Sequence, residues 1–198
     1  MNESIMQIIE RLKSRRPLQQ LAPERIWDEA LDAEIAAISL ANPDAPEGIA
    51  LKAGLHLWND SLDRSHSYAQ LIEDNPTGGY WHGLMHRMER DYSNAKYWFY
   101  QAGAHPVMDS LQKRASEWLL HEIDFKQLPE GEIRDMLYEV TKQPRWNPAA
   151  FTDSIALQGR GLGCEALRQV LEELQHIELL ELIAYTLRAA EESERVSR

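Results

Sequence analysis

Cysteine, long apolar runs and basic charge are all scarce in this chain of 198 residues. The single cysteine, Cys164, cannot form an internal disulfide, so the covalent staple of many small secreted domains is excluded. The most apolar segment, residues 179–187, is interrupted by Glu181 and is far shorter than the ~20 residues that span a bilayer. We therefore expect a soluble protein without a membrane partner, in a reducing compartment, and assign it to the cytoplasm.

The first residues also lack the pattern of an export signal. Glu3 and Glu10 interrupt residues 1–16, and the apolar side chains between them follow a helical spacing. Basic residues are outnumbered by acidic ones, 21 to 32, which gives a formal charge of -11. Because phosphate neutralisation supplies most nucleic-acid affinity and an acidic surface repels polyanions, the charge argues against a nucleic-acid partner.

Alternation of apolar and polar positions, the mark of a strand, is missing too. Apolar residues instead recur at spacings of three and four, which predicts helices. We expect an all-α fold, a single domain over residues 1–198 that forms an irregular bundle or array of about eight to ten helices. Residues 1–22 would hold a peripheral N-terminal helix, residues 163–194 a long central helix, and residues 191–198 a frayed tail.

Turn and cap residues place the boundaries between these helices. Pro23 suits the first turn of a helix over residues 22–42. Helices over residues 48–60 and 61–74 follow, with an uncertain boundary between them, and Gly78 and Gly79 are expected to break the chain before the next helix. The sequence further predicts helices over residues 78–90, 93–103, 107–123, 130–143 and 147–159.

The helix over residues 93–103 has its own cap and repeat signals. Ser93 is the expected N-cap and Gly103 the expected C-cap. Its sequence resembles one helix of a Sel1-type or tetratricopeptide repeat, in which small and aromatic residues interlock neighbouring helices. A single copy does not make such an array, and we expect no fixed-period repeat in this chain.

Polar residues among large apolar ones form the most informative pattern. A helical residue advances about 100°, so His82, His86 and Glu89 share one face. Neutral imidazoles and a carboxylate are good ligands for zinc or another first-row divalent metal, and two histidines one turn apart reach the same ion.

The preceding region repeats this spacing. His56, Asp60 and Asp63 share a face, and His66 follows Asp63 by three residues. If the two helices pack antiparallel, the two polar stripes meet, as in helical bundles that bind metals between their helices. The predicted metal ligands or their partners are therefore His82, His86, Glu89, Asp60, Asp63 and His66.

Other readings of the same residues stay open. Buried histidines often pair with carboxylates for structural reasons only, because an unpaired buried polar group costs roughly 1–3 kcal/mol. Metal-free acid–base chemistry would use an imidazole that titrates near neutral pH. No sequence pattern identifies a catalytic nucleophile. A pocket for a small polar ligand would be lined by Trp81, Arg87, Lys96, Trp98 and His105.

Residues 76–106, "PTGGYWHGLMHRMERDYSNAKYWFYQAGAHP", resemble the motif of a family of helical proteins found in bacteria and fungi. The resemblance extends upstream to "DSLDRSH" and more faintly to the last helix. It implies no particular activity. His56 lies outside the family's pattern, and Met88 stands where the family has arginine. The polar residues on matching positions are Asp60, Asp63, His66, His82, His86, Arg87, Glu89, Asp91, Asn94, Lys96 and His105.

The sequence therefore predicts a histidine and carboxylate pocket for a divalent metal or a small polar ligand, and a hydrolytic reaction if the metal keeps an open position. The alternative is a non-catalytic helical scaffold or protein-interaction module whose histidines pair with carboxylates. The sequence also leaves open a protein partner or a homodimer, because a long apolar C-terminal helix can complete either a monomer core or an interface.

Overall fold

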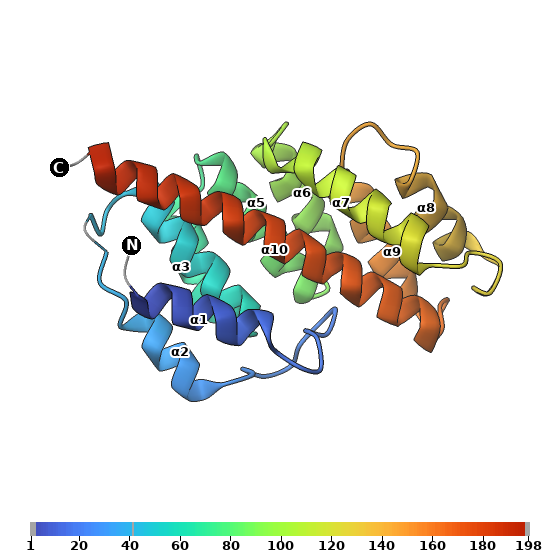
Figure 1. Cartoon of the computed structure of the whole chain (residues 1–198), viewed down its shortest axis with the longest axis horizontal. Helices are drawn as coiled ribbons and strands as arrows, with labels where there is room; N and C mark the ends of the chain where they lie inside the picture. Colours follow the sequence, from blue (N-terminus) through green and yellow to red (C-terminus); the bar gives the residue numbers. More distant parts are fainter. Residues whose placement is uncertain (1–2, 41, 197–198) are drawn as a thin grey trace.

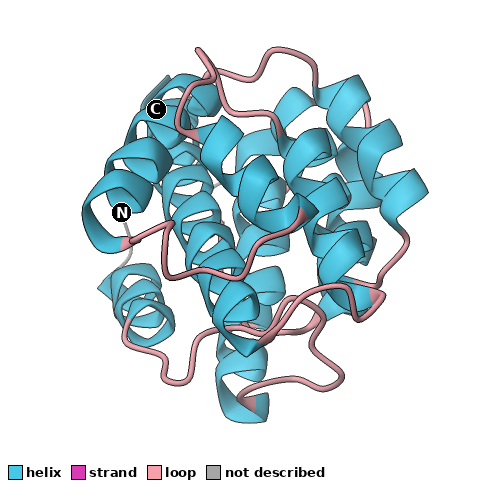
Figure 2. Cartoon of the chain, turned by 90° about the vertical axis from the view of Figure 1, so that its right-hand side faces the viewer, coloured by secondary structure: helices cyan, strands magenta, loops and turns pink. Residues whose placement is uncertain are grey.

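The computed structural model describes residues 3–40 and 42–196, and within these ranges the chain is all helical, without a strand (Figure 2). Ten α-helices and one short 3-10 helix (η1) in these described ranges confirm the all-α, single-domain fold. Their bounds are α1 Glu3–Lys13, α2 Glu29–Ala36, α3 Pro46–Trp58, α4 Leu62–Ala69, η1 Gln70–Ile72, α5 Pro76–Met88, α6 Tyr92–Ala102, α7 Val107–Glu122, α8 Glu132–Val140, α9 Pro148–Gly159 and α10 Glu165–Val196.

The long last helix organises the molecule. α10 runs along most of its length and packs against α3, α7 and α9 (Figure 1). Its inward face includes Leu171, Leu174 and Leu182, which are fully buried. The helix continues through residues 191–196, where the sequence predicts a frayed tail, and residues 197–198 lie outside the described part. None of the described helices is long and apolar enough to cross a membrane.

The second helix is shorter than the spacing predicts. α2 begins at Glu29, after Asp28, whose side chain accepts a hydrogen bond from the Leu31 amide, so Pro23 precedes the helix instead of starting it. α2 ends at Ala36, and residue 41, near the predicted end, lies outside the described residues. The apolar spacing of residues 22–28 belongs to a loop, in which the Trp27 amide donates to the Asn59 carbonyl, and helical periodicity alone does not distinguish such a loop from a helix.

Caps set the ends of α5 and α6. Asn75 accepts hydrogen bonds from two amides at the start of α5, so Gly78 and Gly79 lie inside the first turn and do not break the chain. At α6 the N-cap is Asp91, which corrects the prediction of Ser93. The predicted C-cap, Gly103, is confirmed, with a φ of 63°.

Two consecutive helix hairpins share one design. The first hairpin comprises α3 and α4, and the second comprises α5 and α6. α3 and α5 have 13 residues each, and both begin with a proline, at positions 30 residues apart (Pro46 and Pro76). The expectation of no fixed-period repeat is therefore wrong for this part of the chain. The repeat lies in the backbone. Few equivalent positions of the two hairpins carry the same residue, so the repeat is not apparent from the amino-acid sequence.

The turns inside the two hairpins also match. Asp60 and Arg90 both occupy the left-handed region, at φ 62° and 66°. In each turn the next amide donates a hydrogen bond of 2.9 Å to the carbonyl of a histidine five residues earlier, His56 or His86. This helix-terminating pattern places a histidine at the same point of both hairpins.

A buried ion pair joins α5 to α10. The Arg87 guanidinium lies 2.5 Å from the Glu178 carboxylate, and both side chains are fully buried. The other Glu178 oxygen accepts hydrogen bonds from the Tyr80 hydroxyl and the Trp146 indole. Because burial of an unpaired charge is costly, these contacts fix α5 against the long helix.

Candidate metal centre

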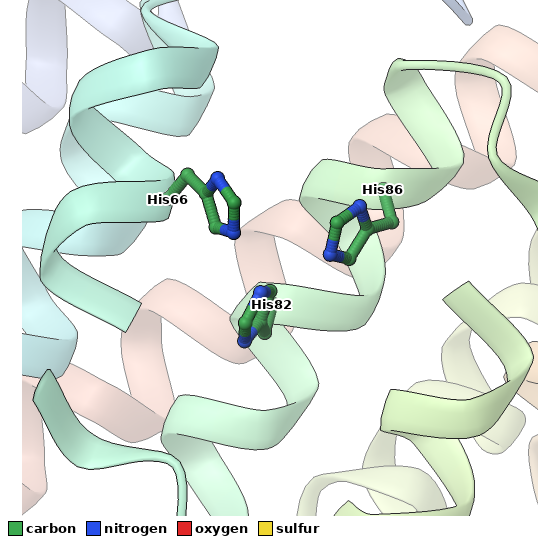
Figure 3. A group of neighbouring side chains, drawn as sticks. All are labelled: His66, His82 and His86. Atoms are coloured by element: carbon green, nitrogen blue, oxygen red, sulfur yellow. The ribbon is translucent and has the colours of Figure 1, made fainter. Parts of the chain in front are cut away.

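Three histidines from two helices meet between α4 and α5 (Figure 3). His82 and His86 lie one turn apart on α5, and His66 comes from α4. Ring centroids are 4.8 Å apart for His82 and His86, 4.8 Å for His66 and His82, and 5.2 Å for His66 and His86. One ring nitrogen of each residue lies within 4.8 Å of the others. These three residues are called the histidine cluster.

Two glycines of α5 allow the neighbouring elements to come close. A Cβ on Gly78 would lie 2.5 Å from the Ile72 carbonyl oxygen, in the segment that follows α4. A Cβ on Gly83 would lie 2.7 Å from the Phe99 ring of α6. Any side chain at these two positions would push the neighbours away, so the glycines allow η1 and α6 to pack close to α5.

His82 forms the floor of the histidine cluster. Its side chain is 2% exposed, and neither ring nitrogen has a hydrogen-bond partner within the described part of the chain. The Trp98 ring stacks on it at 4.0 Å with an interplanar angle of 17°. Burial, and then the neighbouring His86 and His66, lower the pKa of His82 to about 3. The imidazole is therefore neutral at pH 7, and one nitrogen carries an unused lone pair.

His86 has partners on both ring nitrogens. Nδ1 lies 3.2 Å from a carboxylate oxygen of Glu89, and Nε2 lies 3.0 Å from the amide nitrogen of Asn94. Burial lowers the pKa of His86, although the Glu89 carboxylate opposes the shift. Because an ionised carboxylate only accepts, Nδ1 carries the proton and Nε2 receives the Asn94 amide hydrogen.

His66 lies at the edge of the histidine cluster. It is half-buried, whereas His82 and His86 are buried. The Glu89 side chain, which contacts His86, is 35% exposed, so Glu89 and His66 lie on the outer side of the histidine cluster. Figure 3 shows the His66 and His86 rings pointing toward the space above His82.

The predicted carboxylate ligands lie elsewhere or act indirectly. Glu89 contacts His86 but is not one of the clustered ligand groups. Asp60 is held in a buried pair by Arg15 at 2.9 and 2.5 Å, and the Gln19 amide donates to it as well. Asp63 is exposed, because α4 packs on the core through other residues of its surface. Only the histidines of the predicted ligand set come together.

Most of the predicted pocket residues are also separate. Trp98 does contact the histidine cluster, through His82. Trp81 is fully buried and donates to Thr186 of α10. Arg87 pairs with Glu178, as described above. These two side chains leave α5 on faces other than the one that carries His82 and His86.

Lys96 and His105 belong to further contacts away from the histidine cluster. Lys96 forms an ion pair of 2.7 Å with Asp153 of α9. His105 is buried, lies 3.1 Å from the Thr77 hydroxyl and accepts a hydrogen bond from the Val107 amide. Burial lowers the pKa of His105 to about 4. The predicted common pocket is thus divided among separate contacts.

Sequence reasoning missed two partners. Asp32 of α2 lies 2.6 Å from His56 Nδ1 and 3.2 Å from Arg64, and the Asp32 and His56 side chains are buried. Asn94 holds His86, and its only signal in the sequence is its place in the resemblance motif. Both contacts join residues on different helices, which spacing within one helix does not show.

The distances suit a metal ion after a small closure. Zinc with histidine bonds of about 2.0–2.1 Å holds tetrahedral ligand nitrogens roughly 3.3 Å apart. Ligand atoms within 4.8 Å of one another would have to approach by up to about 1.5 Å, which rotation of the half-buried His66 ring would help supply. Three imidazoles also leave one tetrahedral position open.

No protein-family model, curated protein or solved structure matches this chain.

Proposed function

We propose that the protein binds a divalent first-row metal ion, with zinc as the first candidate, through His66, His82 and His86. The observation that carries the proposal is the buried His82 ring, with both nitrogens unpartnered among the described residues and two further imidazoles beside it. A buried polar group without a partner costs about 1–3 kcal/mol. A metal bond would use the free lone pair.

The protonation state of the histidine cluster favours this function. Metal ligation requires neutral imidazoles, and burial lowers the pKa of both His82 and His86. Glu89 accepts from His86 Nδ1, as the outer partner of a metal-bound histidine does, and fixes the orientation of that ring. Under this proposal, three histidines would bind the ion after the small closure described above, and Glu89 would orient one of them.

The chemistry would be hydrolysis or hydration of a small polar substrate in the cytoplasm. A divalent ion with an open position lowers the pKa of a bound water to about 7. His66 and Glu89 lie on the solvent side, where a substrate would enter. The two fully or largely buried histidines would hold the ion from below.

Elemental analysis of untagged protein tests the proposal, alongside isothermal titration with zinc. We expect about one ion per chain in the wild type and none in His82→Leu or His86→Leu, because each lacks one of the three ligands. His121→Ala is the matched control, since His121 is an exposed histidine outside the histidine cluster and its loss should leave the metal content unchanged.

Two results would overturn the proposal. One is a folded His82→Leu/His86→Leu double variant that keeps the wild-type metal content. The other is a wild-type protein that binds nothing after incubation with zinc, manganese, iron or nickel. Circular dichroism establishes in each case that the protein compared is folded.

A non-catalytic helical scaffold is the second candidate. It is favoured by the repeated hairpins and by Tyr97 and Tyr100 of α6, which are 54% and 82% exposed. Exposed aromatic side chains are enriched in protein contacts. Under this function, Tyr97→Ser/Tyr100→Ser would abolish self-association or partner binding in sedimentation experiments, and His82→Leu would not. The reverse pattern would exclude α6 as the contact surface.

A further inference from the structure

We propose that Asn94 controls metal uptake because it occupies the His86 lone pair that the ion requires. This inference rests on the proposed metal binding and names the residue that regulates it. The Asn94 amide nitrogen lies 3.0 Å from His86 Nε2. Asn94 is then a positioning residue in the metal-free protein and a competitor of the incoming ion.

The carboxylate of Glu89 decides which His86 nitrogen carries the proton. It lies 3.2 Å from Nδ1 and can only accept, so the proton resides on Nδ1. Nε2 consequently has a lone pair, and the nitrogen of the Asn94 side chain, which donates, is the complementary partner. The opposite orientation of the amide would set its carbonyl oxygen against the same lone pair.

The amide and the ion cannot occupy this lone pair together. A zinc ion would lie about 2.0–2.1 Å from Nε2. The amide nitrogen lies 3.0 Å from Nε2, so an ion on the same line would be only about 1 Å from that nitrogen. Metal binding at Nε2 therefore requires the Asn94 side chain to turn away.

The surroundings let the side chain move while the backbone stays fixed. The Asn94 backbone amide donates to the N-cap Asp91 at 3.2 Å, within the first turn of α6. The next residue, Ala95, is fully buried. Asn94 itself is half-buried, so its amide can swing toward solvent about its own side-chain bonds.

The first hairpin has a different residue at the same place. Arg64 precedes Asn94 by 30 positions, and its guanidinium lies 3.2 Å from Asp32, the carboxylate partner of His56. A cationic side chain at this position is attracted to the Asp32 carboxylate in the first hairpin, but at the position of Asn94 it would repel a metal ion. The neutral amide of Asn94 holds the histidine without that repulsion.

Zinc affinity measured by competition with a chromophoric chelator tests Asn94 directly. We expect Asn94→Ala to bind zinc about fivefold more tightly, because a neutral hydrogen bond of typical strength no longer has to be broken. Asn94→Arg, which copies the first hairpin, should bind at least about tenfold more weakly. Ser93→Ala, an exposed neighbour in the same turn, is the control with unchanged affinity.

The outcomes separate this inference from the proposed function. If neither the wild type nor Asn94→Ala binds zinc, the metal proposal itself fails. If the wild type binds zinc and Asn94→Ala binds it equally or more weakly, Asn94 is not a competitor and the inference is overturned. A nitrogen-15 NMR spectrum of the metal-free protein gives an independent readout, since Asn94→Ala should shift His86 Nε2 and leave the proton on Nδ1. Unchanged Nε2 would also overturn the inference.

Discussion

The two hairpins place a histidine at the same point of the same turn and surround it differently. In the first, His56 Nδ1 lies 2.6 Å from the buried Asp32 of α2, and its ring stacks on Tyr68. In the second, His86 meets His82 of its own helix and His66 of α4. The repeated backbone thus fixes where the histidine lies, and the preceding helix brings a carboxylate to His56 but an imidazole to His86, whose carboxylate partner, Glu89, lies three residues after it.

The largest expected effect is the stabilisation by zinc, which should depend on His86 and not on His56. Zinc at about 1,000 times its dissociation constant should stabilise the wild type by about 4 kcal/mol. His86→Leu should lose this increment, whereas His56→Leu should keep it even though its metal-free form is less stable. Thermal unfolding with zinc and with chelator measures both. An equal increment in the two variants would show that zinc does not bind through His86.

The next largest effect concerns Asp32, the carboxylate that contacts His56 and Arg64 of the first hairpin. Asp32→Ala leaves His56 and Arg64 without their shared partner, and removal of one member of a buried pair costs about 3 kcal/mol. In metal-free protein, His66→Ala should cost less than about 1 kcal/mol, because His66 is only half-buried. Urea unfolding in chelator gives both values. Comparable losses would mean that the histidine cluster is already a structural unit without metal.

Acid should destabilise the metal-free protein through His82. Its pKa is about 3 in the folded state because of burial, and about 6.5 when unfolded. Between these values the unfolded chain binds the extra proton, so stability falls as pH drops, by about 1.4 kcal/mol per pH unit for this residue. His82→Leu should flatten the decline of unfolding free energy between pH 6.5 and 5.

His56 provides the comparison for that measurement. Burial lowers its pKa too, but Asp32 opposes the shift. We therefore expect His56→Leu to remove less of the acid dependence than His82→Leu removes. If His56→Leu removed more of the acid dependence than His82→Leu, the contact of His56 with Asp32, and not the histidine cluster, would govern acid sensitivity.

The smallest expected effect comes from the aromatic rings that stack on the histidines. Trp98 stacks on His82 in the second hairpin, and Tyr68, 30 residues earlier, stacks on His56 in the first. Trp98→Leu and Tyr68→Leu should each lose about 1 kcal/mol from the aromatic contact. Only Trp98→Leu should also lose a zinc-dependent change in tryptophan fluorescence. A signal that persists in this variant would locate the metal elsewhere.

Helical spacing predicted the fold class and the neighbouring placement of His82 and His86, because both depend on contacts within one helix. It did not predict the destination of Asp60. That residue sits in a left-handed turn and pairs with Arg15, 45 positions earlier in the chain. The predicted helix face of His56, Asp60 and Asp63 is therefore divided in the structure among α3, a turn and α4.

The start of α2 shows the corresponding limit for helices. Residues 22–28 have the apolar spacing of an amphipathic helix, but Trp27 donates its backbone amide to the Asn59 carbonyl. This loop contact uses a hydrogen-bonding group that a helix would have used internally. Such competition between local and distant partners is invisible in the spacing of apolar residues.

The buried pair of Arg87 with Glu178 has a consequence for the proposed chemistry. Arg87 follows His86 directly, so the two side chains leave α5 about 100° apart around its axis. A rotation of α5 that carried the imidazoles away from His66 would also pull the guanidinium from its carboxylate on α10. The long helix therefore helps to fix the rotation of α5 and, with it, the direction of the His82 and His86 side chains, so Glu178→Gln should weaken this constraint.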